Sequence, residues 1–359
     1  MPEIKIAIAG GGTGGHLFPA LSIAAALEAE GVSAIEYYGT ARGPEARLVP
    51  QYGYKFHKIW IKGYPRKLKP EVFLIPVKLT VSVFQCMAAL VRFWPQCLLA
   101  TGGYVCLPFM IAGKLLGLPI VVHEQNSLPG ITTRIGAHWA KIIFYSFPRS
   151  ADYFKDRNAV LSGNPVKKNL GSIDRNEALA SLRLNPERKT IFIFGGSQGS
   201  ATLNRAVSSV MGELNSEFNV IWQTGRGNLP PAIPSGVLAG EFFDDMNTLY
   251  SAADIAVCRA GAMTLAELAA VGLPAILVPF PYAAEDHQRL NAEPLKEAGA
   301  AVLILDRDFN GEVMLDRVNE MLSEPEKLSR MSGAMKSFHY PDSARKIAEA
   351  IIKIAERRE

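Results

Sequence analysis

Two glycine-rich turns, far apart in the chain, constrain the fold more than any other feature of the sequence. Residues 4–16 read IKIAIAGGGTGGH and residues 191–200 read IFIFGGSQGS. In each, an apolar strand runs into a glycine-rich turn and then into a helix, which is the opening unit of a Rossmann-like domain. Because a chain of 359 residues is long enough for two domains, this weak internal repeat predicts two Rossmann-like domains.

Short apolar segments alternate with helical patterns along the whole chain, which is typical of an α/β fold with parallel sheets. We expect strands at residues 5–10, 33–39, 97–103, 119–125 and 141–147, and again at 190–196, 219–225, 254–261, 274–280 and 301–306. A polar stretch places the linker near residues 162–168. The predicted domains are residues 1–163 and 164–341, and residues 342–359 form an amphipathic helix expected to pack back towards the N-terminal domain.

Composition excludes several classes of protein. The net charge of +4 is far from the concentrated charge of a nucleic-acid binder. The four cysteines form no C-x-x-C pair, so we expect free thiols in a reducing compartment. The first residues enter a strand directly, without the pattern of a signal peptide. The most apolar segment, residues 72–95, is interrupted by Pro76, Lys78, Gln85 and Arg92, so no membrane-spanning helix is expected.

The first glycine turn satisfies the G-x-G-x-x-G fingerprint of dinucleotide-binding domains through Gly10, Gly12 and Gly15. A nicotinamide or flavin site also needs an acidic residue at the end of the next strand. Glu36 has the right distance but precedes the expected end of its strand, and His16 follows the third glycine at once. The sequence therefore disfavours a dinucleotide cofactor here without removing that alternative.

The second glycine turn predicts a diphosphate site. Gly195, Gly196 and Gly199 leave backbone N–H groups able to face an anion, Ser197 adds a hydroxyl, and the following helix contributes its positive end. The turn lacks the lysine of an ATPase P-loop. The structural alternative is a tight turn whose glycines only permit close packing.

A third cluster lies between residues 258 and 291. Gly261 leads into a helix in which Glu267 falls one turn inside, where a carboxylate can accept both hydroxyls of a ribose; the alternative is an ordinary helix glutamate. The polar group at residues 285–291 follows an expected strand and suits sugar hydroxyls, although a solvated turn would have the same composition.

Seven motifs, in this order, resemble the MurG family of bacterial glycosyltransferases: GGGTGGHLFPA, ATGGYV, HEQN, SGNPV, GGSQG, FDDM and CRAGAMTLAELAAVGLPAILVPF. The resemblance covers nearly the whole chain. It implies an α/β GT-B glycosyltransferase fold, with two Rossmann-like domains facing across a cleft. It also implies inverting transfer of N-acetylglucosamine from UDP-N-acetylglucosamine to the 4-hydroxyl of the muramyl sugar of lipid I, which gives lipid II in peptidoglycan synthesis.

The resemblance assigns substrate-binding residues to both domains. Thr13, Gly14, Gly15 and Asn126 match contacts of the N-terminal domain near the acceptor and the donor sugar. The matching donor-site residues of the C-terminal domain are Lys167, Ser197, Gln198, Gly199, Phe243, Ala262, Met263, Thr264, Glu267 and Gln288. Among these, Ser197 matches a diphosphate contact, Glu267 the ribose carboxylate and Gln288 a donor-sugar contact. This chain departs from the family pattern at Phe243, which replaces an aliphatic residue at the uracil edge, at Lys167, which replaces an arginine, and at His287, which replaces a glutamine.

The reaction needs a base to take the proton of the acceptor hydroxyl. His16, at the start of a helix beside the first glycine turn, is the first candidate, and Glu124 in HEQN is the rival or a partner. No metal is expected, because Asp306-Arg307-Asp308 matches the D-x-D letters of metal-dependent transferases but adjoins no phosphate loop. The family resemblance also implies metal independence and no cofactor.

Residues 55–78 combine seven basic residues with one acidic residue and interleaved aromatic and aliphatic side chains. Such a segment is expected to dock on an anionic membrane surface, and a charged loop over a core helix is its structural alternative. A lipid-linked acceptor would place the protein peripherally on the cytoplasmic face of the bacterial plasma membrane, where other cell-wall synthesis and division proteins are possible partners. Two other functions stay open: another GT-B enzyme, such as a transferase with a different acceptor or a UDP-N-acetylglucosamine epimerase, and a nucleotide-sugar-binding module without catalysis.

Overall fold

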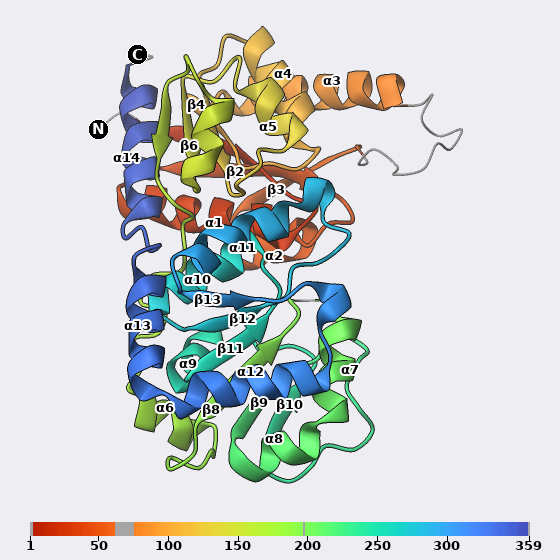
Figure 1. The fold of residues 1–359 in the computed structure, drawn as a ribbon. Coiled ribbons are helices and arrows are strands. Elements are labelled where there is room, and N and C mark those ends of the chain that lie inside the picture. Colours follow the sequence, from red (N-terminus) through yellow and green to blue (C-terminus); the bar gives the residue numbers. More distant parts are fainter. Residues whose placement is uncertain (1–2, 62–74, 197, 358–359) are drawn as a thin grey trace. The chain divides into compact units, whose positions relative to one another are not determined.

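A computed structural model describes residues 3–61, 75–196 and 198–357. The chain folds into two compact units (Figure 1). Unit 1 comprises Met1–Val166 together with Tyr340–Glu359, and unit 2 comprises Lys167–His339. Each unit is an α/β layer structure around one parallel sheet.

The sheet of unit 1 has seven strands in the order β3-β2-β1-β4-β5-β6-β7. Their bounds are β1 Lys5–Ala9, β2 Ala34–Thr40, β3 Lys55–Ile59, β4 Cys97–Ala100, β5 Ile120–Glu124, β6 Ile142–Tyr145 and β7 Ala159–Leu161. All neighbouring pairs are parallel. The chain builds outward from β1 in one direction and then from β4 in the other, so the turn after β1 lies at the switch point where ligands bind in such sheets.

Both faces of this sheet are covered by helices. The helices of the unit are α1 Gly14–Ala29, α2 Glu45–Gln51, α3 Ile75–Phe93, α4 Cys106–Leu115, α5 Ile131–Gly136 and α14 Ser343–Glu356. Ile6 and Ile8 of β1 pack in one core cluster with α1 and with Ile347 of α14. The intervening Ala7 and Ala9 pack in a second cluster with α3 and α4. Burial on both faces explains why the strand segments are apolar without alternation.

Helix α3 is, by length and composition alone, the one helix of the described residues that could cross a membrane. Its window Pro76–Phe93 has a mean hydropathy of 1.3. Cys86 and Leu90 are nevertheless fully buried in the core of unit 1, whereas Phe84 is 65% exposed. Helix α3 therefore has one face in the core of its own domain and exposed apolar side chains on another face.

The sheet of unit 2 has six parallel strands in the order β10-β9-β8-β11-β12-β13. Their bounds are β8 Thr190–Phe194, β9 Asn219–Gln223, β10 Val237–Gly240, β11 Ile255–Cys258, β12 Ala275–Leu277 and β13 Ala301–Leu303. The helices are α6 Arg175–Ser181, α7 Ala201–Ser209, α8 Met211–Glu217, α9 Met246–Ala252, α10 Ala262–Val271, α11 His287–Glu297, α12 Gly311–Ser323 and α13 Pro325–Lys336. Here β8 takes the central place that β1 has in unit 1, so the second glycine turn also lies at a switch point.

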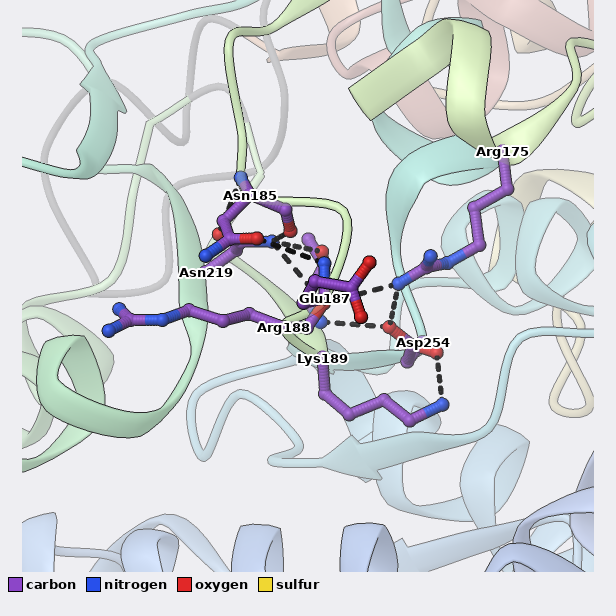
Figure 2. A network of polar contacts seen from close by, with 8 residues as sticks. Arg175, Asn185, Glu187, Arg188, Lys189, Asn219 and Asp254 are labelled. Atoms are coloured by element: carbon purple, nitrogen blue, oxygen red, sulfur yellow. Dashed lines mark hydrogen bonds and ion pairs between the residues drawn. The ribbon is translucent and has the colours of Figure 1, made fainter. Parts of the chain in front are cut away.

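A polar network fixes the amino-terminal edge of this second sheet (Figure 2). The carboxylate of Asp254 accepts hydrogen bonds from the backbone N–H of Thr190 at 2.8 Å, from Arg175 of α6 at 2.9 Å and from Lys189 at 3.0 Å. Three donors on one largely buried carboxylate tie α6, β8 and β11 together. This edge carries a structural network, and the glycine turn lies at the opposite, carboxyl-terminal edge.

Candidate active site

The first glycine turn is filled by a carboxylate of the protein itself. Glu45, the first residue of α2, is fully buried, and its Oε2 accepts the backbone N–H of Gly12 at 3.1 Å. Its Oε1 accepts the N–H of Thr40 at 3.0 Å and the hydroxyl of Thr40 at 2.7 Å. A Cβ atom on Gly11 would lie 2.4 Å from this carboxylate, so the turn is closed around it.

This arrangement argues against a dinucleotide at the first turn. In the dinucleotide fingerprint the second glycine lets the backbone approach the pyrophosphate. In this chain the amide of that glycine, Gly12, donates to Glu45 instead. A second anion beside a buried carboxylate would meet like-charge repulsion.

The candidate base His16 lies in the first turn of α1, with Thr13 as the N-cap residue and Gly14 and Gly15 beginning the helix. Its Nδ1 lies 3.1 Å from the carbonyl oxygen of Thr101, which follows β4, and 2.8 Å from Oε1 of Gln125, which follows β5. Among the described residues, Nε2 of His16 has no hydrogen-bond partner. The ring is therefore held by one nitrogen while the other is left for a ligand.

The rival base, Glu124, is 2% exposed and is held within its own loop. Its Oε1 accepts the backbone N–H of Asn126 at 3.0 Å and the side-chain amide of Asn126 at 3.3 Å. Its Oε2 accepts the N–H of Gly130 at 3.1 Å. Both carboxylate oxygens are thus engaged in shaping residues 124–130, which places Asn126 at the carboxyl end of β5.

The second glycine turn follows β8. Gly199 has φ +73°, and a Cβ atom there would lie 2.1 Å from the carbonyl oxygen of Thr224, so only glycine allows this close approach of the turn to the loop after β9. Gln198 is exposed, and Ser200 caps α7 by accepting the N–H of Leu203. Ser197, the predicted diphosphate contact, lies outside the described residues. No buried carboxylate closes this turn among the residues that the structure describes, in contrast to the first turn.

The predicted ribose carboxylate, Glu267, lies on α10, whose first residues are Ala262, Met263 and Thr264. The hydroxyl of Tyr250, on α9, donates a hydrogen bond to Oε2 of Glu267 at 2.8 Å. Burial raises the pKa of Glu267 to about 7, and the hydrogen bond from Tyr250 opposes part of that rise. Glu267 is therefore a partly buried carboxylate on the helix that starts at the carboxyl edge of β11.

The remaining residues predicted for the donor site also lie in unit 2. Phe243 is half-buried, packs against Gly240 and donates its backbone N–H to Gln223 at 3.0 Å. The pKa of Asp245 is lowered chiefly by the hydrogen bond from the side chain of Thr248, and the charge of Lys167 adds a smaller part of this lowering. Gln288, in the first turn of α11, accepts the backbone N–H of Phe280 at 2.9 Å. His287 bonds through Nδ1 to the carbonyl of Ala284 at 2.8 Å.

Asp306, the first aspartate of the D-x-D sequence, is committed to protein contacts. It forms an ion pair with Arg259 and accepts the hydroxyl of Thr202 at 3.1 Å. Asp308 is 60% exposed on its side chain. In residues 3–61, 75–196 and 198–357 no group of three or more metal-ligating side chains comes together.

Sequence reasoning missed three residues that organise these sites. Gln125 lies inside the HEQN motif, between Glu124 and Asn126, which were predicted as site residues. The motif indicates that Gln125 lies near the site but does not indicate what its side chain does. Glu45 and Tyr250 were not singled out, because an acidic residue in a first helical turn and a tyrosine in a short helix are both common. The cavity lined by Lys5, Glu36, Lys55, His57 and Arg92 lies at the amino edge of the sheet of unit 1, away from the glycine turn of that unit.

Comparison with known proteins gives the family. Residues 6–145 match the glycosyltransferase family 28 N-terminal domain and residues 190–347 match the family's C-terminal domain. A relative from Desulfitobacterium hafniense (strain DSM 10664 / DCB-2) is 37% identical over 367 residues, covering 98% of this chain and 100% of the relative. It is named UDP-N-acetylglucosamine--N-acetylmuramyl-(pentapeptide) pyrophosphoryl-undecaprenol N-acetylglucosamine transferase. The crystal structure of Acinetobacter baumannii MurG is similar with a TM-score of 0.76 and 28% identity, over 98% of this chain and 100% of that chain.

The chain belongs to the MurG family. A relative from Chlorobaculum parvum bears the same transferase name and supports this assignment. It is 36% identical over 98% of this chain and 100% of its own length. The GT-B fold expected from the sequence is confirmed, and so is the assignment to this family of glycosyltransferases. A glycosyltransferase of kitacinnamycin, at 17% identity and a TM-score of 0.75, shares the fold alone.

Proposed function

We propose that this MurG family protein transfers N-acetylglucosamine from UDP-N-acetylglucosamine to the 4-hydroxyl of the muramyl sugar of lipid I. The product is lipid II, the precursor used in peptidoglycan synthesis, which links the protein to cell shape and cell division. The observation that carries this proposal is the full-length likeness, at 37% identity, to a transferase named for the reaction. Units 1 and 2 each present a distinct polar site at the carboxyl edge of a parallel sheet, which suits a reaction between two substrates.

The donor is assigned to unit 2. Unlike the first glycine turn, the turn of Gly195–Gly199 has no carboxylate of its own among the described residues, and α7 starts directly after it. The N-terminus of α10 and the charge of Lys167 add positive potential for the leaving diphosphate. Glu267, with one oxygen held by Tyr250, is placed to accept a ribose hydroxyl with the other. Phe243 and Gln288 line the same edge of the second sheet.

The acceptor and the base are assigned to unit 1. In the proposed step, the acceptor hydroxyl oxygen forms a bond to the anomeric carbon while the bond from that carbon to the diphosphate breaks. The bonding pair leaves with UDP, the hydroxyl proton moves to the base, and the configuration at the anomeric carbon inverts. Both oxygens of Glu124 are engaged by Asn126 and Gly130, which favours His16 as the base. Thr13 and Asn126 flank it at the ends of β1 and β5.

Docking on an anionic membrane surface is assigned to α3 and the strand before it. Val77, Phe84 and Val91 are all more than half exposed and recur every seven residues, so they follow one face of α3. Trp60, 56% exposed, lies beside this face, where its backbone N–H bonds to Gln85 at 2.9 Å and Lys78 lies over its ring. The predicted basic residues Lys62, Arg66, Lys67 and Lys69, with Tyr64, Phe73 and Leu74, lie outside the described residues. We propose peripheral binding to the cytoplasmic face of the plasma membrane, and contacts there with other cell-wall synthesis and division proteins.

Release of UDP tests the proposed function. Purified protein with UDP-N-acetylglucosamine is expected to release UDP only when a lipid I analogue is added. Release or donor conversion without acceptor would instead indicate an epimerase, and no turnover with bound donor would indicate a binding module. The Glu267→Ala variant should weaken donor binding, whereas His138→Gln, at an exposed position bonded to Arg157, should not change turnover.

A further inference from the structure

Three side chains of unit 1 form a hydrogen-bonded row that ends at the candidate base. The row runs from His123 through Gln125 to His16, and it contains a 2.8 Å contact on each side of the Gln125 amide. His123 is fully buried and Gln125 is 1% exposed. Because backbone carbonyls can only accept hydrogen bonds, they determine where each proton of this row lies.

The inner end of the row is fixed by Gly163. Nε2 of His123 lies 3.3 Å from the carbonyl oxygen of Gly163 and 3.4 Å from Oγ of Ser146. The hydroxyl of Ser146 has nearer acceptors for its own proton, the carbonyl oxygen of Glu124 at 2.9 Å and Oδ1 of Asn164 at 2.8 Å. Because the Gly163 carbonyl can only accept, Nε2 of His123 carries the proton. Burial lowers the pKa of His123 to about 4, which keeps the ring neutral and leaves Nδ1 as an acceptor. Nδ1 must therefore receive a hydrogen bond from its neighbour Gln125.

The acceptor role of Nδ1 of His123 determines the orientation of the Gln125 amide in the middle of the row. The side-chain nitrogen of Gln125 lies 2.8 Å from Nδ1 of His123 and 3.0 Å from the carbonyl oxygen of His123. Both partners accept, so this atom is the amide NH₂ group and the amide oxygen must point the other way. That oxygen, Oε1, lies 2.8 Å from Nδ1 of His16.

Two acceptors determine which nitrogen of His16, at the outer end of the row, carries the proton. Nδ1 of His16 faces two acceptors, Oε1 of Gln125 and the carbonyl oxygen of Thr101 at 3.1 Å. Nδ1 therefore carries the proton, and in the neutral ring Nε2 holds a lone pair. A histidine can remove a proton from a substrate only through such a lone pair.

We infer that Gln125 is a positioning residue for the transfer reaction: anchored by His123, it holds the His16 proton on Nδ1 and so leaves Nε2 as the base. This inference rests on the proposed function, because it assumes that His16 accepts the proton of the acceptor hydroxyl. His123 acts one step further away, by orienting the Gln125 amide. Neither Gln125 nor His123 is required to touch a substrate.

The tautomer of His16 can be measured without any substrate. In a long-range ¹H–¹⁵N correlation spectrum of the ¹⁵N-histidine-labelled protein, protonated and lone-pair imidazole nitrogens resonate far apart. We would record it at about pH 8.5, well above the ordinary histidine pKa of about 6.5, and assign His16 from the signals missing in His16→Gln. The expected result is a protonated Nδ1 and an unprotonated Nε2.

Two substitutions at Gln125 then separate positioning from packing. Gln125→Leu removes the acceptor for His16, and we expect a mixed tautomer signal and a kcat at least about tenfold lower, out of the roughly 10²–10⁴-fold that a general base contributes. The KM values for both substrates should stay within about threefold, because no substrate contact is lost. Gln125→Glu keeps an acceptor for Nδ1 of His16, so it should retain the protonated Nδ1 signal and a higher kcat than Gln125→Leu. Its second oxygen has no proton to donate to Nδ1 and the carbonyl oxygen of His123, so only part of the wild-type kcat should return. Gln96→Leu is the matched control, since Gln96 accepts the N–H of Lys5 at the other edge of the sheet.

A protonated Nε2 in the wild-type protein would overturn the inference. It would also be overturned if Gln125→Leu left both the spectrum and kcat unchanged, because Thr101 alone would then suffice. A wild-type protein that shows the expected tautomer but no acceptor-dependent release of UDP would instead overturn the proposed function, so the two failures are distinguishable.

Discussion

The hydroxyl of Tyr250 donates a hydrogen bond to Oε2 of Glu267 across 2.8 Å. The Tyr250 ring is held edge-on by Phe192, with ring centroids 5.6 Å apart, and by Phe194 at 6.1 Å. A buried aromatic pair of this kind leaves the phenol little freedom. Since Oε1 of Glu267 has no partner in the part of the chain that the structure describes, the carboxylate presents one oxygen in a fixed direction.

This relationship predicts a pH dependence of donor binding. With a pKa of about 7, Glu267 is protonated below neutral pH, which replaces a charge-assisted hydrogen bond to the ribose by a weaker neutral one. We expect the KM for UDP-N-acetylglucosamine to rise about three- to tenfold as the pH falls from about 8 to about 6. Initial rates at saturating acceptor measure this.

The Tyr250→Phe variant sharpens that test. The hydrogen bond from Tyr250 lowers the pKa of Glu267, so its loss should move the rise in KM to higher pH. Tyr54→Phe is the matched control, because Tyr54 also donates to a glutamate, Glu28, at 3.0 Å but lies in unit 1. An identical pH profile in Tyr250→Phe and the wild type would contradict the assignment of Glu267 to the ribose.

The raised pKa of Glu267 also predicts how the stability of the folded protein depends on pH: raising the pH should strengthen donor binding but lower stability. Because the folded-state pKa of Glu267 is raised, the folded protein binds a proton more tightly than the unfolded chain between pH 4.5 and about 7. The wild type therefore loses stability relative to Glu267→Gln as the pH rises through this window. At about pH 8 we expect the variant to be more stable, by up to about 3 kcal/mol, and at about pH 4.5 we expect no difference. Urea unfolding at the two pH values measures this, and a pH-independent difference would contradict it.

Glu45 gives a third prediction, since its buried carboxylate holds the first glycine turn through Gly12 and Thr40. Glu45→Ala leaves buried donors without an acceptor, and we expect the free energy of unfolding to fall by about 2–4 kcal/mol. Glu45→Gln keeps one acceptor oxygen and should lose less. Glu30→Ala, at an exposed helix end, is the control and should change the free energy of unfolding by less than about 0.5 kcal/mol. Equal losses in Glu45→Ala and Glu30→Ala would show that the turn does not depend on the carboxylate.

Much of this fold was predictable from apolar runs, and the exceptions share a position. The ten expected strands correspond to strands of the structure, but β3, β7 and β10 were not expected. All three lie at the edge of a sheet. An edge strand has one neighbour and is partly exposed, so segments such as KFHKI in β3 do not need a continuous apolar pattern.

The candidate site was predictable where a backbone conformation demands a residue type. Glycines mark both turns because the chain must bend sharply and pack closely there, and His16 and Glu124 stand beside strand ends that the apolar pattern locates. Gln125, Glu45 and Tyr250 were not predictable, because the role of each needs at least one hydrogen-bond partner that lies 17 to 109 residues away in the sequence. Hydrogen-bond partners at such separations are set by the sheet topology and leave no local pattern.

The exposed face of α3 gives a fourth prediction. Val91→Glu places a charge on an apolar face that we assign to the membrane, so binding to vesicles containing anionic phosphatidylglycerol should weaken about tenfold or more, because burying a charge in the interface is costly. Val160→Glu is the matched control, because Val160 is 41% exposed on β7 in the same unit. Vesicle co-sedimentation measures both. Equal binding of the two variants would contradict the assignment of this face to the membrane. If the wild-type protein bound neutral phosphatidylcholine vesicles as strongly as anionic ones, electrostatic attraction would not contribute to the docking.

The last prediction concerns Gly163, whose carbonyl oxygen accepts from Nε2 of His123 at 3.3 Å and from the hydroxyl of Ser343 at 2.9 Å. Gly163 has φ +73°, and a Cβ atom there would lie 2.3 Å from the side chain of Tyr340, whereas Gly31 has φ +90° and open space around it. Gly31→Ala should therefore cost about 1 kcal/mol, from backbone strain alone. Gly163→Ala should cost at least about 1 kcal/mol more, because Tyr340 must move as well. Since that shift displaces the carbonyl that anchors His123, only Gly163→Ala should also lower kcat. Urea unfolding and steady-state rates on the two variants measure this. If Gly163→Ala and Gly31→Ala lowered the free energy of unfolding equally and changed kcat equally, the packing of Tyr340 on Gly163 would matter neither for stability nor for the row that ends at His16.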